Sequence, residues 1–263
     1  MHRQYARSQI GRTWRRILIA ALAVGLTVLP AAPAAFAAAP DYITHAVADP
    51  NRPKDDRDLD ANRKPAAVLA EARVRPGEIV GEYLPGGGYY TRLLSDVVGP
   101  KGKVYALETT TWGDEAVNAD KALLTEPNHG NVVLDLSPLG TFNPPPQQLD
   151  LFWTTLNYHD LHVPKYAQVD MAAFNKRVFD SLKPGGIYFI VDHAAAPGTG
   201  ASQSPTLHRI EKATVVQEVT AAGFKLVRDS GILHNPADDH TLKVFDPSIR
   251  WKTDQFVLTF RKP

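Results

Sequence analysis

The sequence predicts an α/β fold, in which a doubly wound, mostly parallel sheet of seven strands carries helices on both faces. Three observations predict it. Five short apolar runs alternate with segments whose apolar residues recur at helical spacing, a pattern typical of parallel strands joined by crossover helices. A glycine-rich turn follows the first run. Two later runs have no strong helix between them and therefore suit an antiparallel edge.

The predicted elements follow in order along the chain. The first helix begins at Pro65 and ends before Pro76, and the apolar spacing predicts further helices at residues 90–98, 171–182 and 205–223. Ser204 and Pro205 are typical of a helix start, and Gly223 of a helix end. The strands are expected at residues 78–83, 103–107, 131–134, 149–156, 187–191, 224–232 and 254–260.

The first 37 residues have the pattern of a cleaved secretory signal peptide. Five arginines precede an apolar run at residues 17–29, and Ala35-Phe36-Ala37 provides an A-x-A cleavage site. The apolar run is too short for a membrane span, so we expect no stable span after cleavage. Residues 14–19 loosely resemble a twin-arginine signal, which leaves the general and the twin-arginine export routes both open. We therefore expect an exported protein, periplasmic or secreted.

Charge and cysteine content exclude several classes of function. The chain has 29 basic and 28 acidic residues, and removal of the five signal arginines leaves 24 basic residues and a net charge of −4. No basic cluster remains in the mature chain to bind nucleic acid. The sequence contains no cysteine, which excludes disulfides, zinc thiolate sites and cysteine nucleophiles.

The glycine-rich turn is the first candidate site. Gly86, Gly87 and Gly88 follow a strand and precede a helix, so backbone N–H groups and the positive end of the helix dipole can meet a nucleotide there. A dinucleotide motif would need a glycine at Thr91, and no P-loop lysine follows the turn.

Polar residues stand where the predicted strands end, which is where ligands bind in doubly wound sheets. Glu108 ends the second strand and can accept both hydroxyls of a ribose, while Asp135 ends the third and can accept an adenine amino group. Asn157, Tyr158 and His159 end the fourth strand, and Asp192 and His193 end the fifth. Their joint placement predicts one site at this edge.

From about Lys64 onward the chain resembles the class I S-adenosylmethionine-dependent methyltransferases, and within them a group of exported predicted methyltransferases. The resemblance rests on residues 82–88 as the nucleotide loop, on Glu108 as the ribose acid, and on residues 182–186 before the fifth strand. Leu84 stands where the family has its first loop glycine. The resemblance implies a Rossmann-like sheet, with residues 63–263 as a single methyltransferase-like domain and residues 38–62 as an irregular N-terminal arm that could fold over the site as a lid.

The resemblance also implies the cofactor and the reaction. S-adenosylmethionine is expected as the cofactor of a transferase that methylates a small molecule. The cofactor-binding residues are then expected to be Glu82, Gly86, Gly87, Gly88, Glu108, Asp135 and Asn157. His159 is the first choice of general base, because its ordinary pKa is near ~6.5, and His193 is the second. The residues expected to contact substrate are Tyr158, Asp192, His234, Asp238, Asp239 and His240, the last four in a connection of more than twenty residues.

The main expectation, methyl transfer, includes no metal ion. Two alternative functions stay open beside it. One is an exported protein that binds a small ligand on the same fold without transferring a methyl group. The other is a metal-dependent hydrolase or lyase, since imidazole and carboxylate suit several divalent ions. Its expected ligands are His159 and His193 together with residues 234–240.

Overall fold

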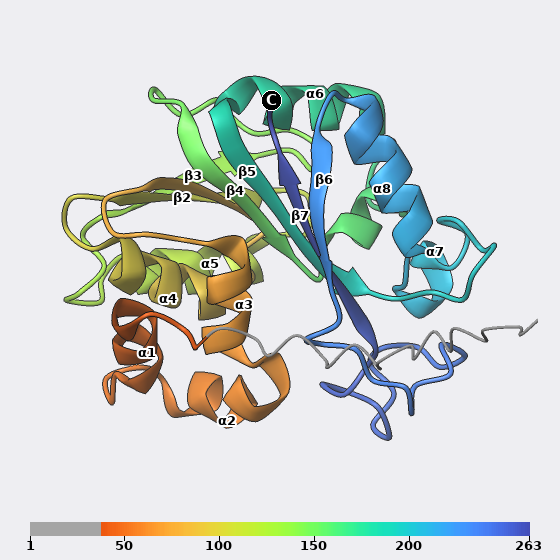
Figure 1. Ribbon diagram of the computed structural model, residues 1–263, viewed down its shortest axis with the longest axis horizontal. Coiled ribbons are helices and arrows are strands. Elements are labelled where there is room, and N and C mark those ends of the chain that lie inside the picture. Colours follow the sequence, from red (N-terminus) through yellow and green to blue (C-terminus); the bar gives the residue numbers. More distant parts are fainter. Residues whose placement is uncertain (1–37) are drawn as a thin grey trace, which may run out of the picture. The chain divides into compact units, whose positions relative to one another are not determined.

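A seven-stranded sheet runs through residues 38–263, the part of the chain that the computed structural model describes (Figure 1). The strand order is β3-β2-β1-β4-β5-β7-β6. The first five strands are parallel to their neighbours, and β7 runs antiparallel to both β5 and β6. The strands are β1 Ile79–Tyr83, β2 Lys103–Thr109, β3 Val132–Ser137, β4 Leu149–Thr155, β5 Leu182–His193, β6 Lys225–Ser230 and β7 Gln255–Arg261.

This architecture confirms the predicted mostly parallel sheet. The predicted antiparallel strand lies one position inside the edge, because β7 inserts between β5 and β6. The structure also starts β5 earlier than expected, since residues 182–186 belong to the strand. The Gly185 N–H donates to the Lys262 carbonyl and the Lys262 N–H donates to the Gly186 carbonyl, which continues the ladder past Arg261.

Helices cover both faces of the sheet (Figure 1). They are α1 Asp41–Ala48, α2 Lys54–Arg63, α3 Pro65–Ala72, α4 Tyr89–Val98, α5 Asp114–Leu123, α6 Met171–Ser181, α7 Ser204–Leu207 and α8 Lys212–Ala221, with a short 3₁₀ helix, η1, at Tyr158–His162. The sequence of β4 shows how two cores arise. Leu151 and Trp153 point into the core beneath α1, α3 and α4, whereas Phe152 points into the core beneath α6 and α8.

Three regions differ from the sequence-based expectation. Residues 38–62, expected as an irregular arm, contain α1 and α2 and pack in the same unit as the sheet, with Ile43 fully buried beside α3 and α4. Helix α5 was not predicted, because only Val117 and Leu123 supply its apolar face. The helix expected over 205–223 is broken into α7 and α8 at His208, whose φ of 56° is left-handed.

The proposed signal peptide and its cleavage site lie outside the described residues. Within residues 38–263, no helix has both the length and the apolar character that a membrane crossing requires.

Candidate functional site

A cavity of about 830 Å³ lies at the carboxyl ends of the central strands. Leu84 follows β1, Leu156 and Asn157 follow β4, and His193 ends β5, and all four line the cavity. The position is the one where doubly wound sheets bind ligands, and the volume lies within the roughly 300–1,000 Å³ of small-molecule pockets. Three of the polar strand-end residues predicted from the sequence, Asn157, His159 and His193, therefore line a real cavity.

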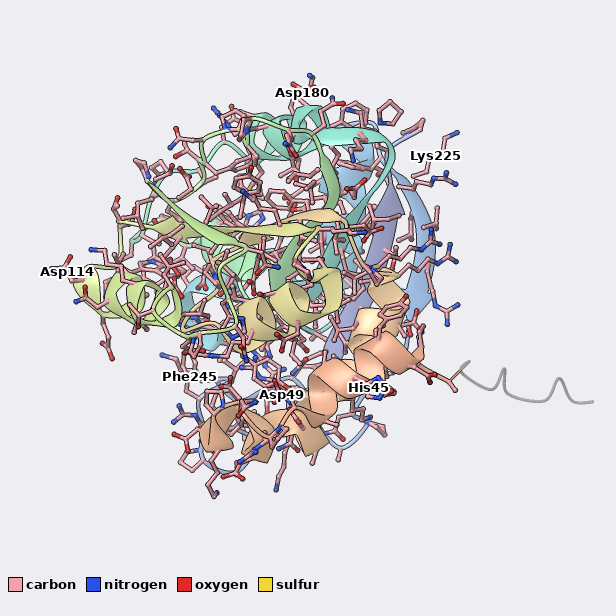
Figure 2. All side chains as sticks on the ribbon, turned by 90° about the vertical axis from the view of Figure 1, so that its left-hand side faces the viewer. His45, Asp49, Asp114, Asp180, Lys225 and Phe245 are labelled. Atoms are coloured by element: carbon pink, nitrogen blue, oxygen red, sulfur yellow. The ribbon has the colours of Figure 1, made fainter. Side chains whose placement is uncertain are left out.

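The opposite end of the sheet carries the strand starts. Figure 2 shows Asp180, near the end of α6, and Lys225, at the start of β6, at one end of the unit, and Phe245 at the other. Phe245 lines the cavity from the long connection between β6 and β7. The connection expected to be functional thus reaches the site.

The glycine turn has the backbone that only glycine adopts freely. Gly86, Gly87 and Gly88 all have positive φ, at 59°, 94° and 88°. A Cβ atom at Gly88 would lie 2.2 Å from Cδ1 of Leu123, which shows how closely α5 packs on the turn. Helix α4 starts directly after Gly88, so its positive dipole end faces the turn.

Leu84 has a backbone conformation that favours glycine. Its φ is 56°, a left-handed conformation that costs a non-glycine residue about 1–2 kcal/mol. The side chain is 3 % exposed and packs in the core beneath α6 and α8, so it leaves most of the cavity open. Leu156, at the end of the neighbouring β4, also has a left-handed φ of 62°. Strain at two adjacent strand ends is typical of a functional site.

Two buried carboxyl groups face the glycine turn. Glu108 accepts a hydrogen bond from the Gly86 N–H at 3.3 Å, and Asp120 accepts one from the Gly87 N–H at 3.3 Å. Burial, the nearby charge of Glu108 and a hydrogen bond with Glu108 together raise the pKa of Asp120 to about 7. Glu108 is among the residues predicted from the sequence, whereas Asp120 is not, since it lies on the unpredicted helix α5.

Glu82 and Asp135 lie outside the cavity lining. Glu82 is 2 % exposed and accepts a hydrogen bond from Thr91 Oγ1 at 2.6 Å, beneath the turn rather than in the cavity. Burial raises the pKa of Glu82 to about 8. Asp135 lies within β3 and accepts a hydrogen bond from Asn143 Nδ2 at 2.6 Å. The structure therefore does not bring Asp135 to the other predicted cofactor residues, because β3 continues two residues beyond it.

Asn157 and Tyr158 have different positions although they are neighbours. Asn157 lines the cavity and donates from Nδ2 to the carbonyl oxygens of Leu84 and Thr155, both at 2.8 Å, which ties β1 to β4. Tyr158 is fully buried, and its hydroxyl donates to Glu218 at 2.7 Å. The predicted substrate contact of Tyr158 is not supported, since its side chain enters the core.

His159 is held by a buried carboxylate. Its ring Nδ1 lies 2.7 Å from Asp192 Oδ1, and its backbone N–H donates to Asp192 Oδ2 at 2.7 Å. Burial lowers the pKa of His159, but the charge of Asp192 and hydrogen bonds with Asp160 and Asp192 outweigh it and raise the pKa to about 10. In this state the ring is protonated at neutral pH, which is opposite to what a general base needs.

His193 has the opposite electrostatic environment. Burial lowers its pKa well below the ordinary value, and the positive charge of His159 lowers it further. Its Nδ1 lies 2.7 Å from Thr253 Oγ1, and the residue lines the cavity. His193 is therefore neutral at pH 7 and is better placed than His159 to accept a proton.

The predicted cluster at residues 234–240 does not line the cavity. His234 and His240 both bond Asp254, each at 2.9 Å, and Asp238 pairs with the buried Arg209. Asp239 lies at the surface and accepts a hydrogen bond from Thr241. The metal site expected from His159, His193 and this cluster is therefore wrong in its ligands, because local partners hold the cluster elsewhere.

The end of α2 adds a cationic side chain to the cavity wall, beside two aromatic residues from other elements. The Arg63 guanidinium carbon, at the end of α2, lies 4.3 Å from the ring centroid of Tyr89 and 5.5 Å from that of Trp251. All three residues line the cavity. Asn62 also lines the cavity, so the end of the arm borders the site as part of a helix rather than as an irregular lid.

Two further cavity residues, Asp160 and His208, are not among those predicted from the sequence. Asp160 Oδ1 lies 3.3 Å from His159 Nε2, and His208 Nδ1 lies 3.4 Å from Asp160 Oδ1. Asp160 follows His159 directly in the sequence, so it could have been predicted as a site residue together with His159. His208 could not have been predicted, because the apolar spacing around it is helical and hides the break between α7 and α8.

Comparisons with known proteins identify the fold. The chain matches no protein-family model and no curated protein. Among solved structures, it is similar to a SAM-dependent methyltransferase from Aquifex aeolicus, with a TM-score of 0.56, 21 % identity, and coverage of 84 % of this chain and 97 % of that one.

Two other structures are similar over most of their length. One is an S-adenosylmethionine-dependent methyltransferase from Mesorhizobium loti, with a TM-score of 0.54, 15 % identity, and coverage of 78 % of this chain and 100 % of that one. The other is the [4+2]-cyclase SpnF, with a TM-score of 0.54, 16 % identity, and coverage of 79 % of this chain and 80 % of that one. The chain therefore has the fold of the S-adenosylmethionine-dependent methyltransferases.

Proposed function

We propose that this protein is an S-adenosylmethionine-dependent methyltransferase that acts on a small molecule. One observation carries the proposal: a left-handed glycine turn, with the buried Glu108 against it, borders a cavity of about 830 Å³ at the carboxyl ends of the strands. The fold, shared with proteins of this activity, supports it. Fold alone does not fix activity, so the proposal depends on the site.

The residues present fit the cofactor. Glu108 would hold the ribose hydroxyls, and the backbone of Gly86 to Gly88 would approach the nucleoside. Leu84, at the position of the missing glycine, has the glycine-like backbone and keeps its side chain in the core. S-adenosylmethionine supplies a methyl group already activated by the charge of its sulfonium.

The chain has to position the acceptor and accept its proton. Holding reactants in line can lower the barrier by about 7–11 kcal/mol. The acceptor's oxygen or nitrogen forms the new bond to the methyl carbon, the carbon–sulfur bond breaks, and its electron pair stays on sulfur. His193, on the cavity wall, is the group we assign to receive the acceptor's proton.

Calorimetric titration with S-adenosylmethionine and S-adenosylhomocysteine tests the proposal. We expect micromolar binding, about −8 kcal/mol. Glu108→Gln should weaken it at least tenfold, because a hydrogen bond to a charged group contributes about 1.5–3 kcal/mol. Asp135→Asn is the matched control and should leave affinity unchanged, since Asp135 bonds Asn143, whereas Glu108 accepts a hydrogen bond from the glycine turn. Absence of binding at millimolar ligand refutes the proposal and favours a fold relative with another use.

We also propose that the protein is exported after cleavage behind Ala37. The basic, apolar and small-residue segments of residues 1–37 support this, in the order that signal peptides have. Mass spectrometry of the protein recovered outside the cytoplasm should give a chain that starts at Ala38. Recovery of the uncut chain from the cytoplasm alone contradicts export.

A further inference from the structure

Three buried donor atoms converge on the cavity wall. They are Nε2 of His159, Oδ1 of Asp160 and Nδ1 of His208, and all three residues line the cavity. We propose that they bind a divalent metal ion of tetrahedral preference, with Zn²⁺ as the best match, and that the fourth coordination position opens into the cavity.

The distances among the three donor atoms indicate a tetrahedral rather than an octahedral site. Nε2 of His159 lies 3.3 Å from Nδ1 of His208 and 3.3 Å from Oδ1 of Asp160, and the remaining side of the triangle is 3.4 Å. Metal–ligand bonds of about 2.05 Å at the tetrahedral angle separate two donors by about 3.3 Å. An octahedral site with bonds of about 2.05 Å separates neighbouring donors by only about 2.9 Å. The spacing of the three donor atoms therefore already matches that of a tetrahedral metal site.

Hydrogen bonding alone does not satisfy the three atoms. If both rings donate to Asp160 Oδ1, their two N–H groups face each other at 3.3 Å. If the His159 ring donates to His208 Nδ1 instead, that nitrogen carries no proton, and its lone pair faces the carboxylate. One contact is unfavourable in either arrangement, whereas a cation at the centre is attracted to all three.

The surroundings orient the donors as metal sites require. Asp192, fully buried, lies 2.7 Å from Nδ1 of His159, so the neutral ring that binds a metal would keep its proton on Nδ1 and offer Nε2, the second proton being released as the metal binds. Such a carboxylate–histidine pair is the usual outer support of a metal-bound imidazole. His208 is fixed by its neighbours: Ile210 exchanges backbone bonds with the end of β5, and the buried Arg209 donates to the Ala194 carbonyl at 3.0 Å. The ligand backbone is thus held in place.

The use of the ion rests on the proposed function. A metal ion lowers the pKa of an oxygen bound to it, so a hydroxyl at the fourth position can release its proton to His193 before methyl transfer. The substrate class is then an acceptor that presents a hydroxyl oxygen, as in an alcohol or a phenol. His193, also on the cavity wall, lies close enough to His159 to approach such an acceptor, with the two ring centroids 5.8 Å apart.

Titration of the chelator-treated full chain with Zn²⁺ alone tests the site. We expect one equivalent to bind. His208→Ala should lower affinity by more than the roughly 10–100-fold that loss of an outer partner costs, while Asp192→Asn should fall within that range. His162→Ala is the control, because His162 belongs to η1 but bonds Glu218. It should bind Zn²⁺ like the wild type.

Two further measurements keep the outcome decisive. The Co²⁺-loaded protein should show the intense visible absorption of a tetrahedral ion, and weak octahedral bands contradict the proposal. Asp160→Asn supplies a second ligand variant if His208→Ala does not fold, as judged by circular dichroism. Unchanged Zn²⁺ affinity in a folded ligand variant overturns the site. S-adenosylmethionine binding is measured separately, so loss of zinc binding with intact cofactor binding rejects this inference alone.

Discussion

The buried carboxyl group of Glu82 should make the stability of the fold depend on pH. Glu82 has an ordinary pKa of 4.5, and burial raises it to about 8 in the folded protein. Between these two values the unfolded chain is ionised while the folded chain keeps its proton. The free energy of unfolding is therefore highest below pH 4.5, falls as the pH rises from 4.5 to about 8, and levels off above about 8.

The size of the effect follows from the two pKa values. Each pH unit inside the window costs about 1.4 kcal/mol, so the full loss is about 5 kcal/mol. Between pH 5 and pH 8 the loss is about 3–4 kcal/mol. Glu82→Gln removes the ionisation and keeps an oxygen that accepts the Thr91 hydroxyl bond. The variant should therefore gain about 3–4 kcal/mol over the wild type as pH rises from 5 to 8.

Urea unfolding of both proteins at several pH values measures the difference. Other buried acids, such as Asp120, titrate in both proteins, so their contribution largely cancels in the comparison. Thr91→Val provides a second check, because the Thr91 hydroxyl lowers the pKa of Glu82 and its removal should extend the decline to higher pH. A stability difference between wild type and Glu82→Gln that stays constant with pH refutes this reasoning.

Two further substitutions test the packing around the site. Gly88→Ala should destabilise the fold in thermal unfolding by more than the about 1–2 kcal/mol of left-handed backbone strain alone, because it also places the new Cβ against Leu123; a loss within that range would contradict it. Arg209→Met should cost about 3–5 kcal/mol in urea unfolding, since it leaves the buried Asp238 without its 2.9 Å ion pair, and a loss below about 1 kcal/mol would show that the pair is not needed.

Short-range patterns determined much of this protein. Strand positions, the glycine turn and the polar strand ends follow from residues that are close in sequence, because apolar periodicity and glycine conformation act within one element. The same patterns placed Glu108, Asn157 and His193 at the cavity or against its turn. Prediction failed where the local signal was weak, as for α5 with its two buried apolar residues, or concealed, as for the break at His208.

Only the tertiary structure decided which polar groups meet. His159 and Asp192 are 33 residues apart, and His159 and His208 are 49 apart, so their contacts depend on how β4, β5 and α7 pack. Residues 234–240 show the converse, since their carboxylates and imidazoles suggested a site but Asp254 and Arg209 already satisfy them. Residue type shows which chemistry a side chain can perform. Its partners, fixed by long-range packing, decide whether the side chain reaches the cavity at all.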